Sequence, residues 1–312
     1  MKGRMGQSTN FMNFCVRFPS CVAHMKITDI LSTGKVTVSC EVFPPKADAP
    51  LENSQKIIRE IAELKPSFMS VTYGAGGTTQ ENTVKIADEI QNVNNITALA
   101  HLTCIGSNKE NIAQVLNELK SHNITNILAL RGDFPENWPS TDPGEYRYAS
   151  ELTEAILQSG DFCVGGACYP EGHTEAKSLQ SDIEYLKVKV DSGCSFLTTQ
   201  MFFDNNILYN FMFRMLKNGV DVPVVAGIMP VTNARQLARI HTLSNATVPP
   251  RFRAIVDRFA DNADAMKQAG IAYATEQIID LVANGITHIN IYTMNKPDIA
   301  GRIMSNLSEI FK

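Results

Sequence analysis

Short apolar segments alternate with longer amphipathic segments from about residue 35 to the end of the chain. The short segments are nearly continuous apolar and β-branched runs, which is typical of parallel strands covered on both faces. Strands are predicted at 35–43, 67–74, 97–104, 126–132, 162–169, 196–203, 222–229 and 288–294. Helices are predicted near 51–64, 79–92, 108–121, 148–159, 175–192, 205–218, 232–244, 264–284 and 297–309.

The number and spacing of these elements favour an α/β fold, a single TIM (β/α)8 barrel, which needs about 250 residues. A doubly wound parallel sheet is the alternative, but eight regular units fill the chain and leave no second domain. We therefore expect one catalytic barrel over 35–312 and an N-terminal extension over 1–34, partly disordered or loosely helical. The connection Thr247–Asp264, with its two consecutive prolines, is the one long linker and could hold an ordered insertion.

The composition is that of a globular protein, since 44% hydrophobic and 19% charged residues allow a large core. A formal net charge of −4 leaves no basic field for a polyanion, which argues against nucleic acid as a partner. No apolar run reaches the length of a membrane span, so we expect no membrane association. The seven cysteines contain no CxxC pair, and four stand in strand-like runs, which favours a reduced, cytoplasmic compartment.

The first 25 residues are basic and poor in acids. Arg17 and Pro19 interrupt the apolar stretch Phe11–Phe18, so this stretch makes a poor signal peptide. We interpret the segment as a disordered extension, and translation could begin at Met25.

A carboxylate ends the first predicted strand, in the run from Val36 to Pro45. Burying an acid in an apolar run costs free energy unless the acid has a partner or a task. The two prolines after Phe43 stop the strand, so Glu41 lies at its carboxyl end, which is the active-site rim of a barrel. A structural hydrogen bond from Glu41 is the alternative, and the run alone does not separate the two interpretations.

The other strand ends are also polar or aromatic, which indicates a ligand site at one rim of the barrel. The ends of the strands carry, in chain order, Thr72 and Tyr73 (second), His101 (third), Arg131, Gly132 and Asp133 (fourth), Tyr169 and His173 (fifth), Gln200 (sixth), Met229 and Pro230 (seventh), and Tyr292 and Asn295 (eighth). The glycine-rich segment 74–77 is expected to form a flexible turn over this site.

Several catalytic, metal-binding and nucleotide-binding motifs are absent from the sequence, and their absence argues against particular classes of enzyme. No strand ends in lysine, which argues against a Schiff-base aldolase. The chain has no HExxH and no HxH on the first strand, so no metal site is expected. It also lacks a GxSxG elbow, a P-loop and a GxGxxG, so a nucleotide cofactor would not be held in the Rossmann manner. Arg131 beside Gly132 suits bidentate contact with phosphate, while an ion pair between Arg131 and Asp133 is the alternative.

Seven motifs, in this order and spacing, resemble the bacterial-type methylenetetrahydrofolate reductases, which are FAD enzymes on a TIM barrel. They lie at 41–45, 70–75, 100–104, 130–133, 169–173, 199–204 and 227–231. The resemblance implies reduction of 5,10-methylenetetrahydrofolate to 5-methyltetrahydrofolate by NADH or NADPH, with ping-pong kinetics, as a supply of methyl groups for methionine synthesis. It also implies a homo-oligomer, and since the chain ends soon after its last helix, we expect none of the regulatory domain of eukaryotic members.

The resemblance also implies roles for individual residues. Glu41 would be the general acid, and Asp133 would lie near the pyrimidine edge of the flavin and touch the folate pterin. FAD contacts are implied for Thr72, His101, Arg131, Gly132, Asp133, Tyr148, Ala149, Tyr169, His173, Ala176, Asp182 and Lys189, and folate contacts for Asp133, Gln200, Gln236 and Tyr292. Four positions depart from the family: Tyr185 and Val188 replace polar or basic FAD contacts, Ile240 replaces an aromatic residue, and Lys296 replaces an arginine.

Two other functions stay open on the residues alone. One is a flavin-free TIM-barrel lyase or hydrolase that uses Glu41 and Asp133 as an acid/base pair. The other is a non-catalytic protein that binds folate or a nucleotide. A yellow protein whose flavin spectrum is bleached by NADH would favour the reductase over both.

Overall fold

Eight parallel strands form a closed barrel in the computed structural model of the chain, which describes residues 25–45, 51–73, 80–134, 144–244 and 246–312. The strands are β1 (Thr37–Val42), β2 (Phe68–Val71), β3 (Ala98–Thr103), β4 (Asn126–Leu130), β5 (Cys163–Cys168), β6 (Phe196–Thr199), β7 (Val224–Ile228) and β8 (His288–Tyr292). Each pairs in parallel with the next, and β8 pairs with β1 to close the ring. The prediction of a TIM barrel is confirmed.

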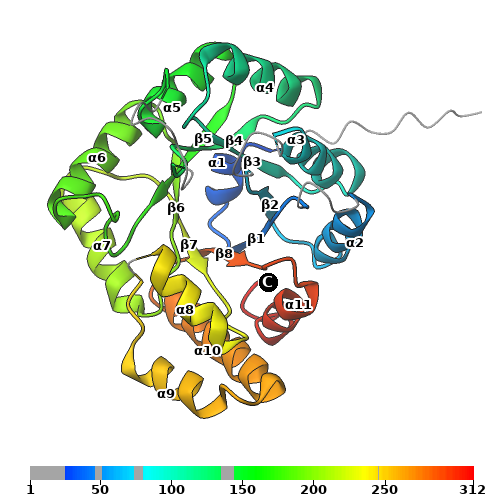
Figure 1. Ribbon diagram of the computed structural model, residues 1–312, viewed down its shortest axis with the longest axis vertical. Helices are drawn as coiled ribbons and strands as arrows, with labels where there is room; N and C mark the ends of the chain where they lie inside the picture. The colour runs from blue at the N-terminus through cyan, green and yellow to red at the C-terminus, as the bar shows by residue number, and fades with distance from the viewer. Residues whose placement is uncertain (1–24, 46–50, 74–79, 135–143, 245) are drawn as a thin grey trace, which may run out of the picture.

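Helices surround the strands on the outside, as Figure 1 shows. They are α2 (Leu51–Ala62), α3 (Gln80–Asp88) with a π-helical turn η1 (Glu89–Val93), α4 (Lys109–Ser121), α5 (Ala149–Ser159), α6 (Leu179–Asp191), α7 (Asn205–Lys217), α8 (Ala234–Leu243), α9 (Pro250–Phe259), α10 (Ala263–Ala283) and α11 (Pro297–Asn306). The main apolar core lies between this layer and the outward faces of the strands. Among the residues that the structure describes, no helix is long and apolar enough to cross a membrane.

Helix α9 is an ordered insertion within the predicted linker Thr247–Asp264, as the sequence allowed. Pro250 occupies its first helical position, where a proline favours a helix start rather than preventing one. Helix α6 begins at Leu179, four residues later than predicted, because Ser178 caps it. The Ser178 hydroxyl accepts the backbone N–H of Ser181 at 3.1 Å, so the residues before it are free to form a turn.

A short helix, α1 (Ile27–Leu31), closes the amino-terminal end of the barrel, inside the ring of strands in Figure 1. Ile27, Ile30 and Leu31 pack in an apolar cluster with residues near the strand starts, which are Phe68, Leu99, Leu128, Cys163, Phe196 and Val225. The backbone N–H of Ile27 donates to Oδ1 of Asn126 at 2.9 Å and fixes the helix. Residues 1–24 of the predicted extension lie outside the described part of the chain. A ligand therefore has the opposite, carboxyl-terminal end of the barrel open to it.

Candidate active site

Glu41 points into the barrel near the carboxyl end of β1. Successive side chains of a strand point to opposite faces, so Val38, Cys40 and Val42 enter the outer core while Ser39 and Glu41 face inward. Glu41 is only 7% exposed. Burial raises the pKa of its carboxyl to about 8, against the opposing effect of a hydrogen bond from Ser70, its register partner on β2. The carboxyl is therefore protonated at neutral pH.

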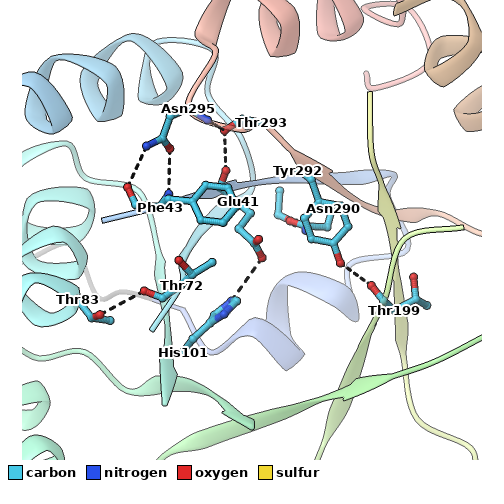
Figure 2. A network of polar contacts seen from close by, with 11 residues as sticks. Glu41, Phe43, Thr72, Thr83, His101, Thr199, Asn290, Tyr292, Thr293 and Asn295 are labelled. Atoms are coloured by element: carbon cyan, nitrogen blue, oxygen red, sulfur yellow. Dashed lines mark hydrogen bonds and ion pairs between the residues drawn. The ribbon is translucent and has the colours of Figure 1, made fainter. Parts of the chain in front are cut away.

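His101 on β3 faces Glu41 across the interior of the barrel. Its Nε2 lies 3.6 Å from Oε2 of Glu41, and Figure 2 shows the ring and the carboxyl pointing at each other. The residue is 6% exposed, and burial lowers the pKa of the imidazole to about 3. Both groups are thus held in their neutral forms by the same cause, which is the loss of water around them.

The backbone around Glu41 is fixed by the loop that follows β8. The hydroxyl of Thr293 donates to the carbonyl oxygen of Glu41 at 2.6 Å. The side-chain amide of Asn295 makes two bonds to the backbone of Phe43, at 2.9 Å to its N–H and 3.0 Å to its carbonyl (Figure 2). Asn295 adopts a left-handed backbone with φ of 55°, a conformation that asparagine tolerates better than most residues. Glu41 is consequently held by a preformed frame rather than by a loose strand end.

Tyr292 on β8 spans the mouth of the barrel to β6. Its hydroxyl donates to the carbonyl oxygen of Thr199 at 2.6 Å (Figure 2). The contact is possible because Gly227 lies beneath the ring, where a Cβ would come within 2.6 Å of the Tyr292 hydroxyl oxygen. Burial raises the pKa of Tyr292 well above its ordinary value, and Glu41, which is ionised at the high pH where a tyrosine titrates, adds to this effect. Tyr292 is therefore uncharged at neutral pH, and its ring borders the mouth of the barrel.

A cavity of about 610 Å³ lies beside the mouth, between the ends of β4 and β5 and helices α5 and α6. Ten residues predicted to contact FAD line it: Arg131, Gly132, Asp133, Tyr148, Ala149, Tyr169, His173, Ala176, Asp182 and Lys189. The remaining two, Thr72 and His101, lie instead at the mouth near Glu41 (Figure 2). The predicted glycine-rich turn at 74–77 lies outside the described residues.

The cavity contains cationic groups that are already engaged. The two terminal Nη atoms of Arg131 donate to the carboxylate of Glu175, at 2.5 and 2.6 Å, rather than to that of Asp133. Gly132 has a φ of 86°, and a Cβ there would lie 2.8 Å from a methyl carbon of Ile105, so only glycine fits this turn. The ammonium of Lys189 donates to the carbonyl oxygen of Ala167 at 2.6 Å, and burial lowers its pKa.

The predicted folate residues separate into two groups. Asp133 and Gln200 line a smaller cavity of about 90 Å³, together with Tyr169 and His173, so Asp133 borders both cavities. Gln236 and Tyr292 line neither of these two cavities, and the side-chain oxygen of Gln236 accepts the backbone N–H of Thr232 at 2.9 Å, near the start of α8. The structure thus brings Gln200 and Asp133 to the wall of one cavity.

The four departures from the family also find places in the fold. Tyr185 and Val188 line the larger cavity from α6 while remaining 64% and 55% exposed. Ile240 is buried in an apolar cluster on α8, so it offers no face for stacking on a ligand. The ammonium of Lys296 lies 3.5 Å from the hydroxyl oxygen of Thr232.

Sequence reasoning assigned no role to two residues of this site. Ser70 stands two positions before Thr72, so strand periodicity could have placed it on the inward face beside Glu41. Glu175, the partner of Arg131, carries no such local signal, because the pair is 44 residues apart.

A closed parallel barrel, with a buried protonated acid at its carboxyl-terminal rim and a large cavity beside it, has the architecture of a TIM-barrel enzyme. The model of the methylenetetrahydrofolate reductase family matches residues 26–308. The 5,10-methylenetetrahydrofolate reductase of Pectobacterium carotovorum subsp. carotovorum is 34% identical over 274 residues, which cover 88% of this chain and 91% of that protein. The chain belongs to the methylenetetrahydrofolate reductase family, which is a family of oxidoreductases.

Other relatives agree with this assignment. The 5,10-methylenetetrahydrofolate reductase of Escherichia coli (strain K12) is 33% identical over 274 residues, with 88% of this chain and 91% of that protein covered. Methylenetetrahydrofolate reductase (NADH) 1 of Arabidopsis thaliana is 35% identical over 298 residues, which cover 91% of this chain and 50% of that protein. A solved structure of an uncharacterized Clostridium thermocellum protein, which binds two copies of 5-methyl-5,6,7,8-tetrahydrofolic acid, matches with a TM-score of 0.63. It is 14% identical over 92% of this chain and 99% of that chain, so it supports the fold alone.

Proposed function

We propose that this protein reduces 5,10-methylenetetrahydrofolate to 5-methyltetrahydrofolate with NADH or NADPH, using bound FAD. The observation that carries the proposal is Glu41, an acid whose pKa burial raises to about 8, at the mouth of a barrel of this family. A general acid must hold its proton at the working pH, and this carboxyl does so.

The residues around the larger cavity fit a cofactor of the size and charge of FAD. A volume of about 610 Å³ is in the range that holds a large organic ligand. The cavity presents the guanidinium of Arg131, the buried ammonium of Lys189 and the glycine turn at Gly132. Such a set of donors suits a diphosphate. When bound, the flavin would accept hydride from the nicotinamide and deliver it to the folate carbon.

Glu41 supplies the proton that the folate reaction needs. The five-membered ring of the substrate must open to an iminium before its one-carbon unit can accept hydride, and opening requires protonation of the leaving nitrogen. The O–H bond of Glu41 breaks and an N–H bond forms on that nitrogen. The burial of Glu41 keeps water from the carboxyl, and the bonds of Thr293 and Asn295 to the backbone around it keep it in position.

Residues on the opposite side of the mouth would hold the folate. Gln200 and Asp133 border one small cavity, and the ring of Tyr292 is fixed by its bond to Thr199. Gln236 would join them through its amide nitrogen, since its bond to Thr232 uses the side-chain oxygen. Because nicotinamide and folate would use the same mouth in turn, ping-pong kinetics are expected. We further propose a cytoplasmic homo-oligomer that supplies methyl groups for methionine synthesis.

The test is a half-reaction experiment on the purified protein. We expect a yellow protein whose flavin spectrum is bleached by NADH or NADPH and restored by 5,10-methylenetetrahydrofolate without oxygen. Glu41→Gln should still be bleached but should restore its colour roughly 10²- to 10⁴-fold more slowly, which is what general acid catalysis contributes. Folate turnover close to that of the unmodified protein in Glu41→Gln would refute the role of Glu41. A colourless protein that cannot be reconstituted with flavin would refute the function itself.

A further inference from the structure

The Nε2 atom of His101 is a buried polar atom without a hydrogen-bond partner among the described residues. Buried polar atoms almost always have a partner, so such an exception needs an explanation. The atom that faces it is Oε2 of Glu41, at 3.6 Å, slightly beyond hydrogen-bond distance. The side chains of Thr293, Asn295 and Tyr292 are hydrogen-bonded, whereas Nδ2 of Asn290 and the hydroxyl of Tyr73 are, like Nε2 of His101, without a partner among the described residues.

The protonation states of the two groups limit what this contact can be. A charged imidazolium beside Glu41 would stabilise the carboxylate and remove the proton that the reaction requires. Burial opposes this, because it lowers the pKa of His101 to about 3 while it raises that of Glu41 to about 8. Tyr292, the other titratable group against Glu41 in the described part of the chain, is neutral and donates to Thr199. The pair is thus a neutral imidazole facing a neutral carboxyl.

We propose that His101 is a positioning residue for Glu41, which donates its Nε2–H toward Oε2 and leaves the proton on the other carboxyl oxygen, facing the substrate. This inference rests on the proposed folate reduction. It concerns the contact with Glu41 and is separate from any contact that His101 makes with a cofactor.

The contact strengthens when it is needed. As Glu41 gives up its proton, the O–H bond on one oxygen breaks and an N–H bond forms on the substrate nitrogen, which leaves a carboxylate. A hydrogen bond to a charged acceptor is shorter and stronger than one to a neutral group, so the 3.6 Å gap closes at this point. His101 stays neutral, and Glu41 recovers its proton from solvent before the next turnover. An interaction that is stronger after charge develops than before it accelerates the step.

Amide substitutions provide a matched test. The amide nitrogen of glutamine reaches the place of Nε2 of histidine, whereas that of asparagine reaches only the place of Nδ1. We expect His101→Asn and His101→Leu to slow reoxidation of the reduced flavin by 5,10-methylenetetrahydrofolate roughly 10- to 100-fold, the value of one hydrogen bond to a charged group. His101→Gln should restore most of the rate. All rates are taken per bound flavin, and bleaching by NADH is measured on the same samples.

The pattern separates a positioning role from a structural or flavin-binding one. If bleaching and reoxidation slow by the same factor in His101→Asn, or if Gln is no better than Asn, the inference is overturned. If the unmodified protein itself does not reduce the folate, the proposed function is refuted. The role of His101 is then decided by the titration described next, which does not depend on catalysis.

A titration without substrate or cofactor gives the second readout. Carbon-13 NMR of labelled glutamate carboxyls, assigned with Glu41→Gln, reports the pKa of Glu41 in the folded protein. Loss of the Nε2–H donor should raise this pKa in His101→Asn, because the carboxylate loses its stabilising partner, and His101→Gln should return it toward the original value. An unchanged or lower pKa in His101→Asn would contradict donation from His101 to Glu41, whatever the protein catalyses.

Discussion

The guanidinium of Arg131 and the carboxylate of Glu175 form a bidentate ion pair, with nitrogen–oxygen distances of 2.5 and 2.6 Å. The pair lies on the wall of the larger cavity, where Arg131 is the residue best suited to a phosphate group. The hydrogen bonds from Arg131 lower the pKa of the Glu175 carboxyl, so it remains an anion at neutral pH. An incoming diphosphate must therefore share Arg131 with Glu175 or displace it.

Glu175→Gln is expected to bind ADP, a probe for the diphosphate part of FAD, more tightly. The Glu175 side chain is 58% exposed, so the gain should be modest, about fivefold or less. Calorimetric titration of the flavin-free protein measures the affinity. Glu184→Gln on α6, at a residue that does not line the cavity, is the control and should change nothing. Weaker binding in Glu175→Gln would mean that Glu175 orients Arg131 rather than competing for it.

Glu41→Gln should change how the free energy of unfolding depends on pH. The folded protein keeps the Glu41 proton up to about pH 8, whereas the unfolded chain loses it near 4.5. The unfolded state thus binds fewer protons between these values, so the Glu41 contribution to stability falls as pH rises through this window. Glutamine removes this loss, so the stability of Glu41→Gln relative to the unmodified protein should rise by up to about 4 kcal/mol between pH 5 and 8. Urea unfolding at both pH values measures it, and a constant difference would contradict the raised pKa.

Asp133→Asn should raise the midpoint potential of bound flavin, provided that the flavin lies where the resemblance implies. Asp133 borders both cavities, so its negative charge would oppose the anionic reduced flavin. We expect a rise on the order of 20–40 mV, which is one to two kcal/mol for two electrons. Dye equilibration measures the potential. Glu171→Gln is the control, because it also removes one negative charge from a residue that lines the smaller cavity. An unchanged potential in Asp133→Asn would remove this role.

Gly227→Ala should displace Tyr292 from the mouth. The new Cβ would lie 2.5 Å from the Thr199 carbonyl oxygen and 2.6 Å from the Tyr292 hydroxyl oxygen, so the hydrogen bond between them cannot persist. We expect a loss of about 1–3 kcal/mol in the free energy of unfolding. We also expect the KM for folate to rise more than the KM for the nicotinamide. Gly301→Ala, whose Cβ would meet Leu64 at an ordinary 3.4 Å, is the matched control.

Tyr292→Phe separates the two causes in that experiment, because it removes the hydroxyl without adding a Cβ. If Tyr292→Phe leaves the KM for folate unchanged while Gly227→Ala raises it, then the position of the ring matters rather than its hydrogen bond. If neither variant changes the KM, Tyr292 does not shape the folate side of the mouth.

The sequence by itself determined the barrel fold and the position of Glu41 at the end of the first strand. Each strand is an apolar run whose two faces are both covered, and this local pattern needs no knowledge of distant residues. The prolines after Phe43 likewise place Glu41 at a strand end from neighbouring residues alone. The start of α6, the helix α9 and the position of α1 at the amino-terminal end of the barrel required the structure, because caps and apolar clusters there outweigh the local signals.

Tertiary structure alone decided which side chains face one another. Closure of the ring brings His101 to 3.6 Å from Glu41, and it pairs Arg131 with Glu175 rather than with the adjacent Asp133. Strand periodicity sets the direction of a side chain, whereas the stagger between strands and the shape of each loop set its partner. Those depend on packing between segments far apart in the chain, which no local pattern encodes.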